Sequence, residues 1–241
     1  DEGDMSKVQR HQLLDNFAAQ LQQLKGGTPA TDGLFKALEE IIRQFNLPFT
    51  PFENLLSAFR DDIDVQRYVN AEHLLYYCRR SANPVGELVL RLHGYCTPET
   101  LAYSDRICTA LQLINFIQDL DSDYQTRQRL YIPLDELTAA GVDEEDIRLR
   151  HNSPALQQLI AQQIDRAQTL LNAGIPLLEH VDWRLRQVLK LTILGGQRII
   201  EKLRTRRNIY DRPVLTRPDL ILLLWRSIYS SNLSAHGKIR A

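Results

Sequence analysis

The chain has 241 residues, of which 44% are hydrophobic, and a formal net charge of −1. This length suits one large domain or two small ones, with enough apolar residues for a sizeable core. A nearly neutral chain is unsuited to a nucleic-acid-binding surface, so no nucleic-acid partner is expected. Nothing resembles a signal peptide and no apolar segment reaches about 18 residues, so we expect a cytoplasmic protein without a membrane span.

Periodicity typical of helices dominates the sequence, and convincing two-residue alternation is absent. Thr97-Pro98-Glu99 and Asn152-Ser153-Pro154 are strong helix starts, because a polar cap precedes a proline in the first turn. The expected helices span about 6–25, 31–46, 50–63, 71–81, 84–94, 98–124, 154–178, 181–206 and 218–230, with a looser stretch between Pro133 and Gly141. We therefore predict one all-α domain over residues 1–230, a helical bundle around a central cavity, and a disordered tail at 231–241.

Several cofactor classes lack their usual motifs. The three cysteines (Cys78, Cys96 and Cys108) have no CxxC spacing and sit among apolar neighbours, as reduced core thiols do. The six histidines are scattered, which argues against zinc. No dinucleotide fingerprint is found, and Gly195-Gly196 lies inside a helical pattern, where it is expected to allow close helix contact.

One polar seam interrupts the apolar pattern of the expected helix 98–124. Gln112, Asn115, Asp119 and Asp123 are three, four and four residues apart, which places them on one helical face. The positions between them are mostly apolar, so we expect the helix to be buried and its seam to face a buried ligand. Two carboxylates four residues apart can hold Mg2+, although such a pair more often marks a solvated face.

The seam and the segment after it resemble the second aspartate-rich motif of the squalene and phytoene synthases, which are head-to-head trans-isoprenyl diphosphate synthases. The family pattern Q-x-x-N-x-x-x-D-x-x-x-D is followed there by G-R-x-Y-x-P. Arg129, Tyr131 and Pro133 match the second part, with Gln128 where glycine is usual.

Three further segments carry the resemblance, which extends from about residue 1 to 215. The run from Tyr77 to Gly86 is similar to Y-C-x-x-V-A-G-x-V-G, and Arg67-Tyr68 lies upstream at the family's distance. The opening Asp1-Glu2-Gly3-Asp4 resembles the end of the first aspartate-rich motif, so the preceding carboxylate and its helix would be absent from this chain.

Two departures are similar to the bacterial hopanoid-pathway branch of the family. Ser81-Ala82-Asn83-Pro84 replaces V-A-G-x, and Gln118 stands where many relatives carry arginine. That branch converts presqualene diphosphate to hydroxysqualene by Mg2+-dependent ionisation and capture of water, without NADPH. The resemblance implies this reaction, a prenyl or presqualene diphosphate substrate, Mg2+, and other hopanoid-pathway enzymes as partners.

The resemblance also implies roles for individual residues. Metal would be held by Asp119 and Asp123 from one wall, by Asp1 and Asp4 from the facing wall, and by Asn115. Gln112 would orient substrate or water, and Tyr77 would act with the seam in catalysis. The implied substrate contacts are Arg67, Tyr68, Ala82, Asn83, Val85, Gly86, Arg129, Tyr210 and Arg212.

Each assignment has a plainer alternative. The arginines can be solvated or can bind helix ends, and the tyrosines can be ordinary core. Pro84 can kink a helix wall or separate two helices. The cluster Lys202, Arg204, Arg206 and Arg207 is expected to be a solvated helix end, or else a contact for acidic lipid headgroups. The run 220–225 is core or a peripheral membrane anchor.

Other functions stay open within and beyond the family. An NADPH-dependent squalene synthase, an enzyme that condenses two prenyl diphosphates into presqualene diphosphate, and a carotenoid-type synthase share the motif. A non-catalytic helical assembly factor or lipid-binding relative is the alternative from another class. The presence of both Asp119 and Asp123 argues against that last alternative.

Overall fold

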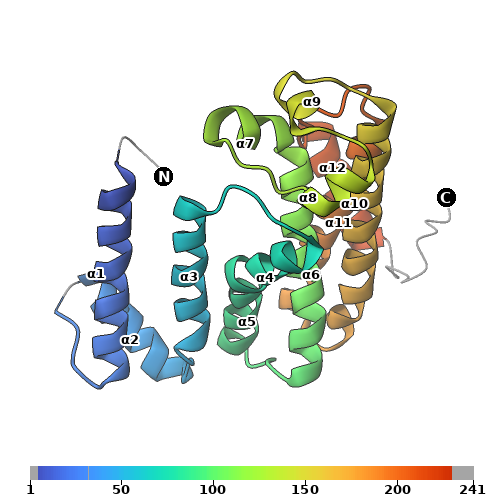
Figure 1. The fold of residues 1–241 in the computed structure, drawn as a ribbon. Coiled ribbons are helices and arrows are strands. Elements are labelled where there is room, and N and C mark those ends of the chain that lie inside the picture. Colours follow the sequence, from blue (N-terminus) through green and yellow to red (C-terminus); the bar gives the residue numbers. More distant parts are fainter. Residues whose placement is uncertain (1–4, 32, 230–241) are drawn as a thin grey trace.

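The computed structural model describes residues 5–31 and 33–229, whose regular elements are helices, with one isolated bridge between Arg67 and Leu130 (Figure 1). The all-α prediction is confirmed. The elements are α1 (Lys7–Lys25), α2 (Gly33–Phe45), α3 (Thr50–Asp64), α4 (Ala71–Ser81), α5 (Asn83–Leu92), α6 (Pro98–Gln118), α7 (Leu120–Arg127), α8 (Leu134–Ala139), α9 (Glu144–Arg148), α10 (Pro154–Gly174), the 3-10 helix η1 (Ile175–Glu179), α11 (Trp183–Thr205) and α12 (Arg217–Tyr229). Asp1, Asp4 and the expected tail at 231–241 lie outside the described residues.

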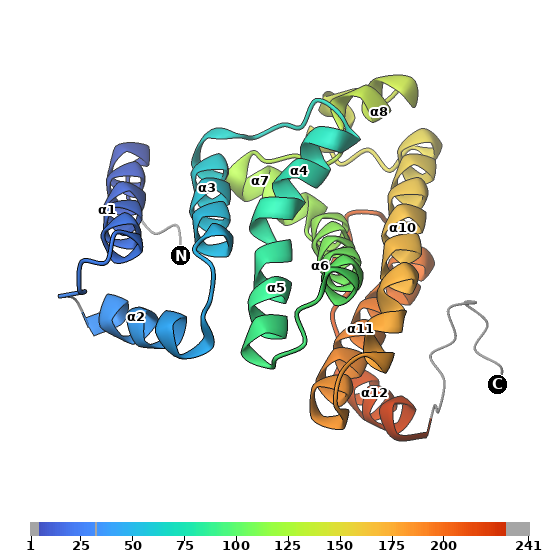
Figure 2. The same cartoon turned by 90° about the horizontal axis from the view of Figure 1, so that it is seen from below.

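Helix α6 is the centre of the fold, with α10 on one side and α5 on another, and with α4 and α11 also in contact (Figures 1 and 2). It begins as expected at Thr97, whose hydroxyl accepts from the Thr100 amide at 3.2 Å while the Thr100 hydroxyl accepts from the Thr97 amide at 2.8 Å. Its buried positions include Ile107, Ala110 and Leu113. A helix that is apolar around most of its circumference has to be packed on several sides, which explains its central place.

Glycines allow the helices around α6 to approach closely. A Cβ on Gly174 would lie 2.4 Å from Ile107 Cγ1 and 2.9 Å from the Tyr103 carbonyl oxygen, so α10 ends directly against α6. A Cβ on Gly196 would lie 2.9 Å from Leu111, whereas one on Gly195 would meet only Leu215 at 3.9 Å. The expected close contact at Gly195-Gly196 is therefore confirmed for Gly196.

The expected helix 98–124 is wrong in one respect, because it breaks at Asp119. The backbone there has φ −99° and ψ 12°, so α6 ends at Gln118 and α7 begins at Leu120. The Asp119 amide donates to the Asn115 carbonyl and the Asp123 amide donates to the Asp119 carbonyl, each at 2.8 Å, so Asp119 closes the last turn of α6 and opens the first turn of α7. Gln128 then ends α7 with φ 56°, a left-handed conformation that favours glycine, the usual residue of the family at that position.

Two other stretches differ from the sequence prediction, and the expected break between residues 81 and 84 is present. The stretch 133–148 contains the short helices α8 and α9. The helix that starts at Pro154 ends at Gly174, and its expected last residues form η1 instead. Helices α4 and α5 are separate, but Ala82 between them keeps right-handed helical angles, so the break at Pro84 is also a kink.

One continuous hydrophobic core joins α3 through α11, and its members extend in sequence from Ala58 to Ile209. On the outer side, α1 and α2 pack against each other, α1 packs on α3, and α3 contacts α4 and α5 (Figure 1). Within residues 5–31 and 33–229, no helix is both long and apolar enough to cross a bilayer.

We predict that Gly174→Ala destabilises the protein by roughly 1–3 kcal/mol, because the added methyl group overpacks the contact with Ile107. Gly195→Ala is the matched control, and we expect it to stabilise helix α11 by about 0.5–1 kcal/mol. Urea denaturation measures both. Equal free energies of unfolding for the two variants would show that the α6–α10 contact is not as close as described.

Candidate active site

The carboxylates of Asp119 and Asp123 lie at the break between α6 and α7. The Asp119 side chain is 17% exposed and that of Asp123 is 8% exposed. Asp119 accepts a hydrogen bond from Nε of Arg212, which follows α11 in the chain, and Asp123 accepts from Nη1 of Arg127 at 2.9 Å. Burial raises the pKa of Asp123, and Arg127 partly opposes this effect. Two acids from the predicted seam are therefore brought together, each beside an arginine.

The seam as a whole is less buried than expected. Asn115 is exposed, and Gln112 and Asp119 are half-buried, so the prediction of a wholly buried seam is wrong. The elements that contact α6 include α4, α5, α10, η1 and α11, and none of them covers Asn115. Of its four members, only Asp123 lines the cavity beside it.

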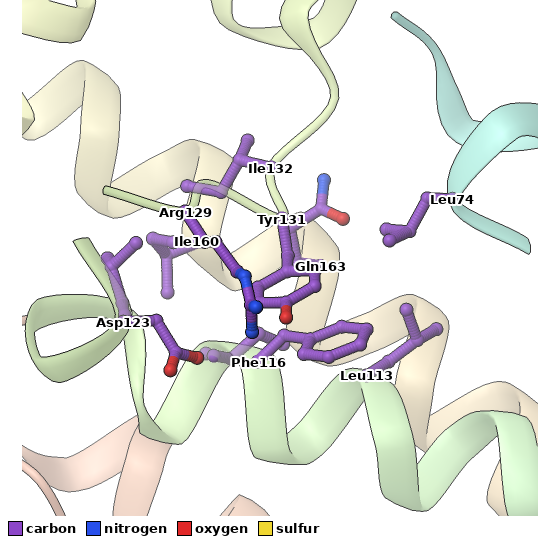
Figure 3. A pocket seen from close by; sticks show the side chains of 11 residues that line it. Leu74, Leu113, Phe116, Asp123, Arg129, Tyr131, Ile132, Ile160 and Gln163 are labelled. Atoms are coloured by element: carbon purple, nitrogen blue, oxygen red, sulfur yellow. The ribbon is translucent and has the colours of Figure 1, made fainter. Parts of the chain in front are cut away.

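That cavity has a volume of about 20 Å³ and lies between the end of α6, α10 and the segment after α7 (Figure 3). Asp123 and Arg129 provide charge, and Phe116, Tyr131 and Ile160 provide apolar surface. Such a space holds about one water molecule, not a thirty-carbon chain. The expected central chamber is thus present beside Asp123 only as a small void.

An aromatic cluster adjoins the cavity. The Phe116 and Tyr131 rings stack with centroids 3.7 Å apart and planes at 5°, and Tyr68 and Tyr77 lie 5.5 and 6.2 Å from Tyr131. Tyr68 and Tyr77 are 3% and 4% exposed, so they belong to the core as well as to the wall of this region. Burial raises the pKa of Tyr131 to about 12.

Sequence reasoning missed Asp62, which connects this cluster to the charged groups. The Tyr77 hydroxyl donates to Asp62 Oδ1 at 2.6 Å, and Nη2 of Arg129 donates to the Asp62 carbonyl. The pKa of Tyr77 is raised by burial and further by Asp62. The acidic run at the end of α3, just ahead of Arg67-Tyr68, was the available signal.

Arg67, an expected diphosphate contact, is held instead by Glu144. Its Nε donates to Glu144 Oε2 at 2.9 Å, a second bond joins Nη2 to Oε1, and the guanidinium lies 5.4 Å from the centre of the Tyr124 ring. Arg67 lowers the pKa of Glu144. Sequence reasoning missed Glu144 too, because this pair joins residues 77 positions apart.

The segment 206–216, between α11 and α12, is fastened to the end of α6. Gln118 Nε2 donates to the Pro213 carbonyl at 2.5 Å, and Arg206 Nη1 reaches the Ile117 carbonyl at 3.4 Å. The Tyr210 hydroxyl donates to the carbonyls of Asp146 and His151 at 3.2 and 3.4 Å. These bonds hold Arg212 beside Asp119.

The prediction that Lys202, Arg204, Arg206 and Arg207 are solvated is wrong for Lys202 and Arg206, because both bond the chain that follows α11. Lys202 donates to the Val214 carbonyl at 2.8 Å and pairs with the buried Asp219, and Arg206 is half-buried. Arg204 is exposed and bonds Asp165 at 2.6 Å, and Arg207 is exposed. Two of the four cations thus help to fasten the end of α11 and the segment after it.

The residues of α4 and α5 that were expected to form a wall of the substrate cavity differ in their exposure. Val85 is 51% exposed, and Ala82 and Gly86 are half-buried. Gly86 lies against Ser104 and Cys108 of α6, where a Cβ would be 2.3 and 2.6 Å from their side chains. Asn83 is 8% exposed and its Oδ1 accepts from the Thr109 hydroxyl at 3.0 Å, so it ties α5 to α6.

A metal at Asp119 and Asp123 would have oxygen ligands of the kind that Mg2+ prefers, and Mg2+ needs only one or two protein carboxylates. Among residues 5–31 and 33–229, no group of three or more acids, histidines and cysteines is close enough to hold a metal. Asp1 and Asp4, the expected facing ligands, are outside that range. The residues present therefore fit one wall of a magnesium diphosphate site.

Comparison with known proteins agrees with this geometry. The family model for squalene/phytoene synthase matches residues 1–219, so the chain belongs to the squalene/phytoene synthase family. A hydroxysqualene synthase of Rhodopseudomonas palustris is 39% identical over 160 residues, which cover 66% of this chain and 54% of that protein. The hydroxysqualene synthase of Sinorhizobium fredii is 36% identical over 170 residues, covering 70% and 58%. The chain thus spans little more than half the length of these curated relatives.

Solved structures show the same fold. The squalene synthase HpnC from Alicyclobacillus acidocaldarius is 38% identical and superposes with a TM-score of 0.80 over 88% of this chain and 78% of that one. A dehydrosqualene synthase in complex with a ligand gives a TM-score of 0.81 over 89% and 76%, at 21% identity. The expected isoprenoid-synthase-type helical bundle is confirmed.

We predict that Thr109→Val destabilises the protein by about 1–3 kcal/mol, because it leaves the buried amide oxygen of Asn83 without its donor. Thr192→Val, on the exposed side of α11, is the control and should change stability by less than about 0.5 kcal/mol. Thermal unfolding measures both. A Thr109→Val protein of unchanged stability but altered product would instead place Asn83 in contact with substrate.

Proposed function

We propose that the protein ionises presqualene diphosphate with Mg2+ held by Asp119 and Asp123, and that water captures the cation to give hydroxysqualene. The observation that carries this proposal is the pair of carboxylates at the α6–α7 break, with Arg127, Arg129 and Arg212 close by. The names of the two bacterial relatives and the motif departures at Asn83 and Gln118 support the choice of reaction.

The reaction requires that negative charge on a departing diphosphate be matched. Mg2+ bound at Asp119 and Asp123 would neutralise that charge when diphosphate leaves. The guanidinium groups of Arg212 and Arg129 present planar donors that suit phosphate oxygens, and the segment 206–216 keeps Arg212 at the end of α6. These arginines compensate the two acids when no diphosphate is present, and they can turn to phosphate when it binds.

The groups beside the acids suit the positive product of ionisation. The rings of Tyr131 and Phe116 lie next to Asp123 and Arg129, and ring faces attract a cation (Figure 3). The Asp62 carboxylate accepts from the Tyr77 hydroxyl, and its backbone carbonyl accepts from the Arg129 guanidinium. Asp62 therefore positions Tyr77 for the cation and Arg129 for the departing diphosphate. Gln112 and Asn115, on the accessible side of α6, are the seam residues that water can reach.

We predict that incubation with presqualene diphosphate and Mg2+, without NADPH, yields a C30 alcohol. Asp119→Asn and Asp123→Asn should each lower turnover at least a thousandfold, because the leaving charge is then unmatched. Asp121→Asn, on the same helix but paired with Arg150, is the control and should keep turnover within about threefold. Product analysis by mass spectrometry measures all four proteins.

Other outcomes of the same assay decide between the alternatives. Squalene formed only with NADPH would identify a squalene synthase. Presqualene diphosphate or phytoene, formed from farnesyl or geranylgeranyl diphosphate, would identify a condensing enzyme. Lipid binding without turnover by the unmodified protein would contradict the proposal and support a non-catalytic relative.

We also propose that α11 and α12 contact an acidic membrane from which the substrate is taken. Four apolar side chains of α12 are at least half exposed: Leu220, Ile221, Leu224 and Trp225. The two helices carry eight lysines and arginines and two carboxylates, of which Asp219 is buried. Exposed apolar side chains on helices that carry a surplus of cations suit a peripheral contact with anionic lipid.

In a sedimentation assay, vesicles containing phosphatidylglycerol should bind the protein more strongly than vesicles of phosphatidylcholine alone. Ile221→Asp should lower the bound fraction several-fold, because it places a carboxylate in the apolar face. Ile41→Asp, an exposed apolar position on α2, is the control and should leave binding unchanged. Equal binding to both kinds of vesicle, or an equal loss in both variants, would contradict this contact.

A further inference from the structure

A second cavity, of about 260 Å³, lies between the first half of α10 and the C-terminal end of α11. Its apolar lining comes from Ile160, Ile164, Leu203 and Ile209. Three arginines also line it, Arg204, Arg206 and Arg207. None of these arginines bonds Asp119 or Asp123, although Ile160 lines both cavities and Arg206 also fastens the segment 206–216 to the end of α6.

The charge in this cavity is incompletely compensated. Arg204 is paired with Asp165 at 2.6 Å, but the bonds of Arg206 go to carbonyl oxygens, those of Ile117 at 3.4 Å and Asp211 at 3.2 Å. Nε and Nη2 of Arg206 are buried without a hydrogen-bond partner. A buried cation with unused donors is unfavourable unless an acceptor is supplied. Burial lowers the pKa of Arg206 to about 10, which agrees with this reading of the contacts.

We propose that this cavity binds a small diphosphate that carries a short apolar chain, and that it does so without metal. The exposed guanidinium of Arg207 would take the diphosphate oxygens first, and Arg206 would join it by turning its unpartnered Nε and Nη2, which are buried as they stand, toward the ligand. The apolar lining would take the chain. At about 260 Å³ the cavity is near the lower limit for ligand sites, so a thirty-carbon substrate does not fit. The choice of a prenyl diphosphate among phosphates rests on the proposed function.

The test is isothermal titration of the full chain in EDTA, first with inorganic diphosphate and then with dimethylallyl diphosphate. Both should bind at one site, and the prenyl compound about tenfold more tightly, as expected if roughly two methylene groups are buried. Removing Mg2+ separates this site from Asp119 and Asp123, which are proposed to bind diphosphate through metal. Metal-free binding in the cavity between α10 and α11 and turnover at Asp119 and Asp123 can therefore fail independently.

Four variants test whether the two ligands bind in the cavity between α10 and α11. Arg207→Gln, at an exposed position, should weaken both ligands about tenfold, and Arg206→Gln should do so at least as strongly. Arg184→Gln, exposed at the start of α11, and Asp123→Asn should leave metal-free binding unchanged. Absence of binding in EDTA, undiminished binding by Arg207→Gln, or loss of binding by Asp123→Asn would overturn the proposal. Equal affinity for the two ligands would overturn the role of the apolar lining.

Discussion

Two carboxylates lie at the end of a largely buried apolar helix, and their charge has to be balanced by groups from distant parts of the chain. Helix α6 contacts α4, α5, α10 and α11, yet Asp119 directly follows its last residue, Gln118, and Asp123 lies one turn further on at 8% exposure. Desolvation of such acids is unfavourable, and like charges add to it, so each needs a cation nearby. The structure supplies Arg212 and Arg127, and the proposed chemistry supplies Mg2+ in addition.

The segment 206–216 owes its position to the same requirement. Its bonds to the end of α6 come from Gln118 and Arg206, and they hold Arg212 beside Asp119 although the two residues are 93 positions apart. On the other side of the break, Asp62 joins the Tyr77 hydroxyl to Arg129. Acids, arginines and aromatic rings from four parts of the chain therefore meet at one bend. The arginines at this bend suit the negative diphosphate, and the aromatic rings suit the positive carbocation, which ionisation would separate.

Much of the fold could be predicted from the sequence, because caps and periodicity are local. Thr97 and Ser153 begin α6 and α10 as expected, and the apolar circumference of α6 correctly indicated a buried helix. The break at Asp119, the exposure of Asn115 and the fastening of Lys202 and Arg206 could not be predicted, since each depends on which distant element packs nearby. Asp62 and Glu144 were missed for the same reason, because their partners are 15 and 77 residues away. The motif identified the acids, and only the structure shows what surrounds them.

The most direct measurement is a crystal structure of the protein with Mn2+ in place of Mg2+ and an unreactive diphosphate, with the metal located by its anomalous signal. We predict metal at about 2.0–2.3 Å from a carboxylate oxygen of Asp119 or Asp123, with the Arg212 guanidinium moved from Asp119 to the diphosphate. Metal bound elsewhere, while Arg212 stays on Asp119, would contradict it.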